Sequence, residues 1–569
     1  MNLIPYLKTN WRPQTTVLAI CGFLITLVLL IYQQAPSCEF IALDDPAYIT
    51  NNALVSKGLS WANVWSALTD VHVALWIPMT WISLMADVSM FGVSSSSVAI
   101  HGVNVLFHAA NAVLVFLWLR SATGRVWPSA VVAALFAAHP INVESVLWAT
   151  ERKNVLCLFF TLWTLFFYTR YVKRPTKLSY VAAAVFFALS LMAKPMSITL
   201  PVFFLLLDFW PLNRMSRATV IARVREKVPF FLISYAALLV GMYAPAQLGV
   251  SVDFTTLPVA TRATNAAISY VTYLRQFVWP EGLGVIYMHP MRAIWLQAGV
   301  SAAILLGFTI LAVRVRRSHP YFIVGWIWFI VALLPTSGMV QVGEQARADR
   351  FTYLPQLGMF AAAVWFMASF KWTQLRPKLA GELAFAVIAL LGYMTARQIV
   401  YWDNSIAVYD RALSLDPRNA NLLVKASRMN YFFGDAKTAF AQAKKATECA
   451  PHFPDGWVMV GLILSDLQKP EKADEAMAYA ARLDPTDAFT RAALGGIQLQ
   501  AKKYREAAID FRMATYRKPE LVGPRKALDK LIKDHPEDVP TRIKLRHVAL
   551  STIVPEPPSL AASPKPPAP

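Results

Sequence analysis

Long runs of apolar residues alternate with short polar segments over the first 400 residues of the chain. A bilayer core needs roughly twenty apolar residues per helix. The pattern therefore predicts an all-α fold class, with a polytopic membrane domain of about eleven transmembrane helices over residues 1–400. The candidate spans are 15–32, 98–119, 129–146, 155–171, 179–193, 197–209, 229–246, 294–313, 321–334, 354–370 and 379–400.

The loops between these runs differ in charge. If the N-terminus is cytoplasmic, the five inside loops hold seventeen Lys and Arg residues against one acidic residue, Glu226. The first outside loop, residues 33–97, holds one basic residue, Lys57, against five acidic ones. Cytoplasmic loops of membrane proteins carry an excess of Lys and Arg. We therefore expect a cytoplasmic N-terminus and, after an odd number of crossings, a C-terminal domain outside the cytosol.

A 34-residue period governs the last third of the chain. Pro417, Pro451, Pro485 and Pro519 recur at this interval, which is the period of tetratricopeptide (TPR) repeats. Two series of alanines and a pair of glycines keep the same step, and small residues let paired helices pack closely. These are Ala439, Ala473 and Ala507, then Ala412, Ala446, Ala480 and Ala514, with Gly461 and Gly495.

The repeats predict a TPR α-solenoid over residues 401–535. Three full repeats cover 420–519, a half repeat precedes them at 401–417, and 525–533 caps the stack. Residues 536–569 form a C-terminal extension whose Pro-rich tail, 555–569, we expect to be disordered. A TPR stack usually holds a peptide or protein in its concave groove; the alternative is a docking platform for the protein's own oligomer.

Composition supports a membrane protein. Only 15% of the 569 residues are charged and 56% are hydrophobic, whereas soluble domains are about 25% charged. The net charge of +20 lies largely in loops between apolar runs, so we predict no nucleic-acid partner. The four cysteines have no metal-type spacing, and no nucleotide-binding loop, zinc motif or nucleophile elbow is present. We interpret the first apolar run as a retained helix and not as a cleaved signal peptide.

The first outside loop carries the strongest candidate for chemistry, the adjacent acids Asp44 and Asp45. Neighbouring carboxylates raise each other's proton affinity, which suits proton transfer or cation binding. Asp45 precedes Pro46 and could instead cap a helix that has Pro at its first position. Asp44 has no such duty and is the better candidate for a catalytic base.

The same loop is rich in tryptophan over residues 58–92. Tryptophan favours the membrane interface, so we expect amphipathic helices on the outer surface that could roof a cavity; the alternative is a lid without a substrate role. In the second span, His101, Asn104, His108 and Asn111 share one helical face. They form either a hydrogen-bonded seam between helices or part of a substrate cavity.

Cationic residues also occur at the outside turns, against the general charge bias. They are Arg152, Lys194, Arg347 and Arg350. An anion bound at the outer surface would explain them, and Arg is well suited to bidentate contacts with phosphate. The alternative is ion pairing within the chain, as Glu344–Arg347 or Asp349–Arg350. Further candidates for a substrate cavity nearby are His139, Glu144 and Tyr353.

Four segments, in this order, carry a family resemblance that spans most of residues 1–520. They are Leu43-Asp44-Asp45, Ala138-His139-Pro140-Ile-Asn-Val-Glu144-Ser, Met192-Ala-Lys194-Pro195 and Arg350-Phe-Thr-Tyr353-Leu-Pro355. With about eleven helices and C-terminal TPRs, the chain resembles the GT-C glycosyltransferase superfamily, most closely the transmembrane-and-TPR-containing (TMTC) O-mannosyltransferases and their bacterial relatives. Two features depart from that family: the chain has Glu151-Arg152-Lys153-Asn154 where Gly-Arg-Ala-Asp would be expected, and its TPR array is short.

The resemblance implies an inverting enzyme that takes a sugar from a polyprenyl-phosphate donor outside the cytosol, with a catalytic acid in the first loop. The sparse loops suggest a bacterial inner-membrane protein with periplasmic TPRs. We expect transfer to a protein Ser or Thr hydroxyl, with Asp44 as base and Asp45 assisting or capping. Arg350, with Lys194, Arg347 or Arg152, would hold the phosphate, and no metal or other cofactor is required.

Three other functions compete with this hypothesis. A non-catalytic membrane scaffold would use its TPRs to recruit periplasmic partners, and its outside charges would be dispensable. A glycosyltransferase could instead act on a glycolipid or a glycan. A lipid or glycan transporter would carry polar residues throughout the bilayer midplane, whereas here they concentrate near the outer face.

Overall fold

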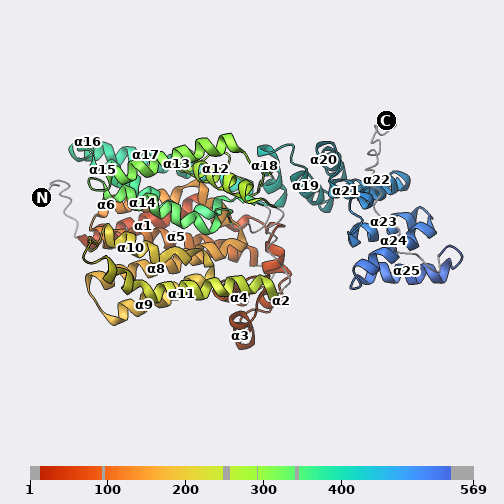
Figure 1. The fold of residues 1–569 in the computed structure, drawn as a ribbon, viewed down its shortest axis with the longest axis horizontal. Helices are drawn as coiled ribbons and strands as arrows, with labels where there is room; N and C mark the ends of the chain where they lie inside the picture. Colours follow the sequence, from red (N-terminus) through yellow and green to blue (C-terminus); the bar gives the residue numbers. More distant parts are fainter. Residues whose placement is uncertain (1–12, 93–95, 248–256, 291, 340–344, 540–569) are drawn as a thin grey trace. The chain divides into compact units, whose positions relative to one another are not determined.

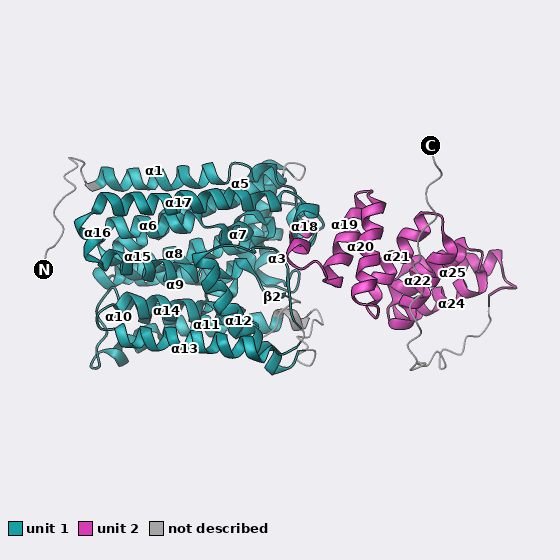
Figure 2. Ribbon diagram, turned by 90° about the horizontal axis from the view of Figure 1, so that it is seen from above, with its two compact units in different colours: residues 1–408 teal, residues 409–569 magenta. Residues whose placement is uncertain are grey.

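The computed structural model describes residues 13–92, 96–247, 257–290, 292–339 and 345–539, which are mostly helical (Figure 1). The chain divides into two compact units, residues 1–408 and 409–569 (Figure 2). The sequence predicted this boundary at 400/401.

In the first unit, each predicted apolar run falls on a helix. Among the described residues, six helices are long and apolar enough to cross a membrane, or up to seven if the bent pair Val126–Ala138 and Pro140–Leu147 forms one span. Four further apolar helices are shorter. The helices fit a polytopic membrane protein, and the count of about eleven crossings stays a prediction. The long helices, the bent pair and the shorter apolar helices together are α1 (Pro13–Ile31), α5 (Ser96–Thr123), α6 (Val126–Ala138), α7 (Val143–Leu147), α8 (Arg152–Lys173), α9 (Lys177–Ala193), α10 (Leu200–Phe209), α11 (Val220–Gln247), α13 (Trp295–Val315), α14 (Pro320–Leu333), α15 (Gln356–Ser369) and α17 (Pro377–Ile399).

The first loop folds into the short helices α2 (Ala53–Ser56), α3 (Trp61–Thr69) and α4 (Pro78–Phe91). They lie at the end of the helix bundle opposite α16 (Lys371–Leu375), as expected if these two loops face opposite sides of a membrane (Figure 1). Trp61 and Trp65 are 90% and 68% exposed on α3, whereas α4 buries Trp81. That this loop roofs a cavity stays a prediction.

Several elements of this unit were not predicted, among them one helix and two short strands. Helix α12 (Val259–Val278) contains Thr, Asn and Arg residues, which lower its hydropathy below that of a span. Strands β1 (Tyr287–Met288) and β2 (Gln345–Arg347) form a two-stranded antiparallel sheet and are too short to show a period. Asn265 of α12 donates to Ala346 O (2.8 Å), which fixes β2 against that helix.

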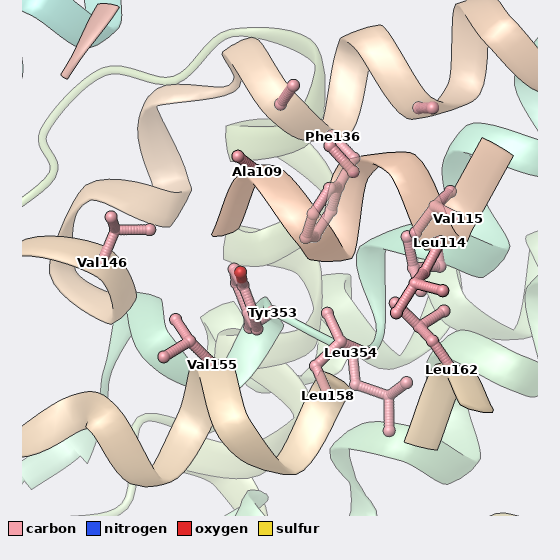
Figure 3. Close-up of a cluster of buried hydrophobic side chains, with 14 of the residues drawn as sticks. Ala109, Leu114, Val115, Phe136, Val146, Val155, Leu158, Leu162, Tyr353 and Leu354 are labelled. Atoms are coloured by element: carbon pink, nitrogen blue, oxygen red, sulfur yellow. The ribbon is translucent and has the colours of Figure 1, made fainter. Parts of the chain in front are cut away.

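The bundle core is continuous between the long helices. Figure 3 shows the ring of Tyr353 among Phe136 of α6 and Val155 and Leu158 of α8. Helices α14 and α15 pack closely at Gly325, where an added Cβ would collide with the carbonyl oxygen of Gly358. Small residues at such a crossing let two helices pack backbone to backbone.

The second unit confirms the predicted TPR repeats. Each repeat forms one helix pair, and each pair packs on the next. Gly495 contacts the partner helix closely, because a Cβ on it would lie 2.8 Å from the Phe511 ring. The pairs are α19 (Ala420–Phe432) with α20 (Ala436–Cys449), α21 (Pro454–Asp466) with α22 (Pro470–Leu483), and α23 (Ala488–Gln500) with α24 (Tyr504–Arg517).

Two helices flank these pairs. Helix α18 (Ser405–Leu415) crosses the boundary between the units and coincides with the predicted half repeat, and α25 (Val522–Asp534) covers the predicted cap. The Pro-rich tail predicted at 555–569 lies outside the described residues.

Candidate functional site

The segment that carries Asp44 is held in place by the chain that follows α17. The backbone N–H of Glu39 donates to Asp403 O (2.8 Å), and that of Ala42 donates to Ser405 Oγ (2.9 Å). These bonds join positions more than 360 residues apart in the sequence. They fix the start of the first loop at one end of the helix bundle.

The Asp44 side chain is 48% exposed, and Lys153 Nζ lies 3.8 Å from its Oδ2. The same ammonium group sits over the Tyr48 ring, 4.4 Å from the ring centroid. Asp44 is thus an accessible carboxylate with a cation beside it. A group of this kind can accept a proton from a molecule that approaches from solvent.

Asp45 has a different role from its neighbour. Its buried carboxylate accepts hydrogen bonds from the backbone N–H of Ile41 (2.7 Å) and from the N–H (3.0 Å) and hydroxyl of Thr150. The predicted helix cap is wrong: a short helix does begin at Pro46, but the Asp45 side chain makes no hydrogen bond to it. Burial raises the pKa of Asp45 to about 6. Asp45 therefore joins the first loop to the turn before α8.

Three cations converge on the carboxylate of Glu151. Lys194 Nζ lies 3.0 Å from Oε2, while Lys153 Nζ and Arg350 Nε lie 3.3 and 3.4 Å from Oε1. Asn154 adds a neutral partner, because its Oδ1 accepts from Lys194 Nζ (3.2 Å). The cations come from the start of α8, the turn after α9 and the turn after β2, so only the fold brings them together.

Arg350 is also fixed by Glu144. Its guanidinium forms an ion pair with Glu144, and its backbone N–H donates to Glu144 Oε2 (2.7 Å). The predicted alternative partner, Asp349, instead accepts from Tyr287 Oη (2.9 Å), and burial raises its pKa well above the ordinary value. Glu344, the other predicted partner in this segment, lies outside the described residues.

Charge is balanced within this group, which we call the Glu151 cluster. It contains three carboxylates and three cations: Asp44, Glu144, Glu151, Arg350, Lys153 and Lys194. The three cationic side chains are 9–13% exposed, whereas the two glutamates are 1% exposed. An anion that approaches from solvent beside the accessible Asp44 therefore reaches the cations before the two glutamates.

The predicted phosphate ligands Arg152 and Arg347 do not contact the Glu151 cluster. Arg152 is buried, forms an ion pair with Asp87 (2.7 Å) and donates to Asn104 Oδ1 (2.6 Å). Its fork is occupied in joining α8 to α4 and α5. The Arg347 guanidinium lies 3.9 Å from the centroid of the Tyr287 ring. We therefore leave both arginines out of the phosphate site.

The polar face of α5 forms a hydrogen-bonded seam. His108 Nδ1 lies 2.7 Å from Tyr353 Oη, and Asn111 donates to Val155 O (2.9 Å). His101 is buried on the same face, with its ring 6.1 Å from that of Phe40.

His139 is likewise occupied by the fold. Its Nδ1 accepts from Ile141 N–H (3.3 Å), and its Nε2 lies 3.3 Å from Phe277 O. These contacts favour the helix seam over substrate contact for His108, Asn111 and His139.

Sequence reasoning missed Lys153 and Glu151. It singled out residues 151–154 but selected Arg152 as the phosphate ligand. Successive residues of a helix point about 100° apart, so Arg152 and Lys153 at the start of α8 cannot both face one site. The acid followed by two bases in Glu151-Arg152-Lys153 was the available signal. Which of the two cations faces the site depends on the rotation of α8 in the bundle.

No protein-family model matches the chain. A protein O-mannosyl-transferase of Caenorhabditis elegans is 22% identical over 429 residues, which are 70% of this chain and 58% of that protein. A TMTC-type protein O-mannosyl-transferase of Drosophila melanogaster is 29% identical over 160 residues, 27% of this chain and 17% of that protein. The chain thus spans less than two thirds of the length of either relative, and its predicted resemblance to the TMTC-type proteins is confirmed.

The solved structures include a distant match to the APC/C hetero-tetramer Cut9–Hcn1. The alignment covers 79% of this chain and 76% of that one at 11% identity, with a TM-score of 0.22. A likeness at this level carries no argument.

Proposed function

We propose, from the resemblance to TMTC-type protein O-mannosyl-transferases, that this chain is an inverting glycosyltransferase acting on protein. It moves a sugar from a polyprenyl-phosphate-linked donor to a Ser or Thr hydroxyl at the outer face of the membrane. The names of both relatives point to mannose as the sugar.

The observation that carries this proposal is the position of Asp44 beside the cations of the Glu151 cluster. A glycosyl transfer of this class needs a base for the acceptor hydroxyl and a stabilising group for the departing phosphate. Asp44 is accessible and Lys153 lies beside it. Lys194 and Arg350 share the Glu151 carboxylate with Lys153. Both requirements are met on one surface of the first unit.

The reaction assigns each group a step. The acceptor oxygen attacks the anomeric carbon, and its proton passes to the Asp44 carboxylate. The bond between the anomeric carbon and the phosphate oxygen breaks with inversion, and both bonding electrons leave with the phosphate. Lys153, Lys194 and Arg350 stabilise the negative charge that grows there, an effect that is strongest where water is largely excluded.

The TPR unit supplies the second half of the proposal. TPR stacks bind peptides and proteins in a groove, so this unit would present the acceptor protein. The charge bias of the loops supports the Glu151 cluster and the TPRs on the non-cytosolic side of the membrane, which would be the periplasm in a bacterial inner-membrane protein. The prenyl chain of the donor would then lie in the membrane, and its phosphate would reach the outer end of the helix bundle.

A transfer assay with the full-length protein in nanodiscs tests the proposal. Radiolabelled polyprenyl-phosphate mannose and a Ser/Thr-rich protein acceptor should yield labelled protein, and Asp44→Asn should abolish most of that label. Asp70→Asn is the matched control, because Asp70 lies in the same loop but pairs locally with Ser66 and Thr69. Label that is absent from wild type, or equal in Asp44→Asn, would favour the scaffold.

A further inference from the structure

Glu151 stands out in the candidate site because one carboxylate is shared by three cations of three different segments. Its two oxygens lie 3.0–3.4 Å from Lys194 Nζ, Lys153 Nζ and Arg350 Nε. These are the groups that the proposed function assigns to the phosphate. Glu151 is 1% exposed, so it lies behind them as seen from solvent.

The proposed reaction changes the charge of the phosphate that these cations hold. The donor is a phosphodiester with one negative charge. The product left after the sugar departs is a monoester, which carries about −1.5 to −2 at neutral pH. A cluster of three cations attracts the product more strongly than the donor. Slow product release limits the turnover of many enzymes, and this site is open to that problem.

We propose that Glu151 competes with the lipid phosphate product for Lys153, Lys194 and Arg350, and thereby speeds its release. This inference rests on the proposed function. The carboxylate already satisfies the cations before the phosphate arrives, so each cation that turns toward the phosphate is drawn away from Glu151. After transfer, the carboxylate draws the cations back and the phosphate leaves.

Glu144 provides a matched comparison within the same cluster. It also pairs with Arg350, but its second oxygen accepts from the Arg350 backbone N–H and not from a second cation. Glu144 therefore fixes the position of one arginine, whereas Glu151 is shared by all three cations. Removing either charge changes the net charge of the cluster equally.

The test measures binding of a polyprenyl monophosphate to the full-length protein in nanodiscs. Glu151→Gln should bind this product about tenfold more tightly than wild type, a change of about 1.4 kcal/mol, whereas Glu144→Gln should change binding by less than about threefold. In the transfer assay Glu151→Gln should lower KM for the donor and also lower kcat, with stronger inhibition by the product. Damage to the fold alone would not lower KM.

Weaker or unchanged product binding in Glu151→Gln would overturn the inference, as would equal tightening in Glu144→Gln, which would reflect net charge alone. If Glu151→Gln does not fold, Glu151→Asp replaces it: the shorter carboxylate competes less well, so the product should bind more tightly, and looser binding overturns the inference. A wild type that binds no polyprenyl monophosphate overturns the proposed function itself, whereas wild-type binding without tightening overturns only the role of Glu151.

Discussion

The carboxylate of Asp45 is joined to Thr150 through two hydrogen bonds, one from the Thr150 backbone N–H (3.0 Å) and one from its hydroxyl. These residues are 105 positions apart in the chain. The contact ties the first loop to the turn that begins α8, where Lys153 lies. It therefore sets the spacing between Asp44, the neighbour of Asp45, and the cation beside it.

This contact makes Asp45→Asn a test of structure. The amide of Asn would turn an N–H group toward one of the three donors that now bond to the carboxylate. A lost or unsatisfied buried hydrogen bond costs about 1–3 kcal/mol. At pH 7 we expect a clear fall in the thermal midpoint of the protein in detergent, and Asp70→Asn should leave it unchanged. An unchanged midpoint in Asp45→Asn would contradict the bridge.

The pKa of Asp45, raised by burial to about 6, gives this residue a pH signature. Because the folded state holds the proton more firmly than the unfolded state, the stabilisation that comes from this proton is complete below about pH 4. It is lost as the pH rises through about 6, by up to about 3 kcal/mol. The midpoint of wild type minus that of Asp45→Asn should therefore shrink between pH 4 and 7. A difference that grows with pH would refute the assignment.

Asp44→Asn should lower activity and leave stability unchanged, in contrast to Asp45→Asn. The Asp44 side chain is half exposed and contacts Lys153 at 3.8 Å, so the thermal midpoint should stay near wild type. Removal of a general base typically lowers the rate about 10²–10⁴-fold, so sugar transfer should fall by that order while donor binding survives. Equal loss of stability in the Asp44 and Asp45 variants would mean that the pair acts as one structural unit.

Substitutions of Arg350 should affect both the stability of the protein and its KM for the donor. Arg350→Ala leaves Glu144 and Glu151 short of a partner at 1% exposure, and breaking a buried ion pair costs about 3–5 kcal/mol. Arg350→Lys keeps the charge and should be more stable than Arg350→Ala. An ammonium lacks the planar fork that contacts two carboxylates or a phosphate, so donor KM should still rise. Normal donor KM in a well-folded Arg350→Lys would remove Arg350 from the phosphate site.

Substitutions at two neighbouring glycines test the role of the TPR unit separately from that of the catalytic residues. In Gly495→Val the new side chain would meet the Phe511 ring, whereas a Cβ added at Gly496 would have no described atom within 4 Å. Gly495→Val should disrupt the third helix pair and reduce labelling of a protein acceptor, yet leave donor hydrolysis or transfer to a small acceptor intact. Gly496→Val should behave as wild type. Equal labelling of the protein acceptor in both variants would exclude acceptor delivery by this repeat.

The pattern of the sequence by itself determined the elements of the fold. Apolar runs long enough to fill a bilayer placed the helices of the first unit, and the 34-residue period of Pro, Ala and Gly placed the TPR pairs. Both signals are local, because each repeats within one helix or between neighbouring helices. Helix α12 was not predicted because its mixture of polar and apolar residues resembles neither a transmembrane span nor a repeat.

Only the tertiary structure decided which polar residues form the site. The sequence marked Asp44, Glu144, Lys194 and Arg350, but it also selected Arg152, and it left Asp45 either to assist catalysis or to cap a helix. The rotation of α8 turns Arg152 toward Asp87 and Lys153 toward Glu151, and the packing of the first loop turns Asp45 toward Thr150. A charged residue can form an ion pair or hydrogen bond with any suitable partner that the fold brings near. Its role therefore depends on contacts across long sequence separations, which no local pattern records.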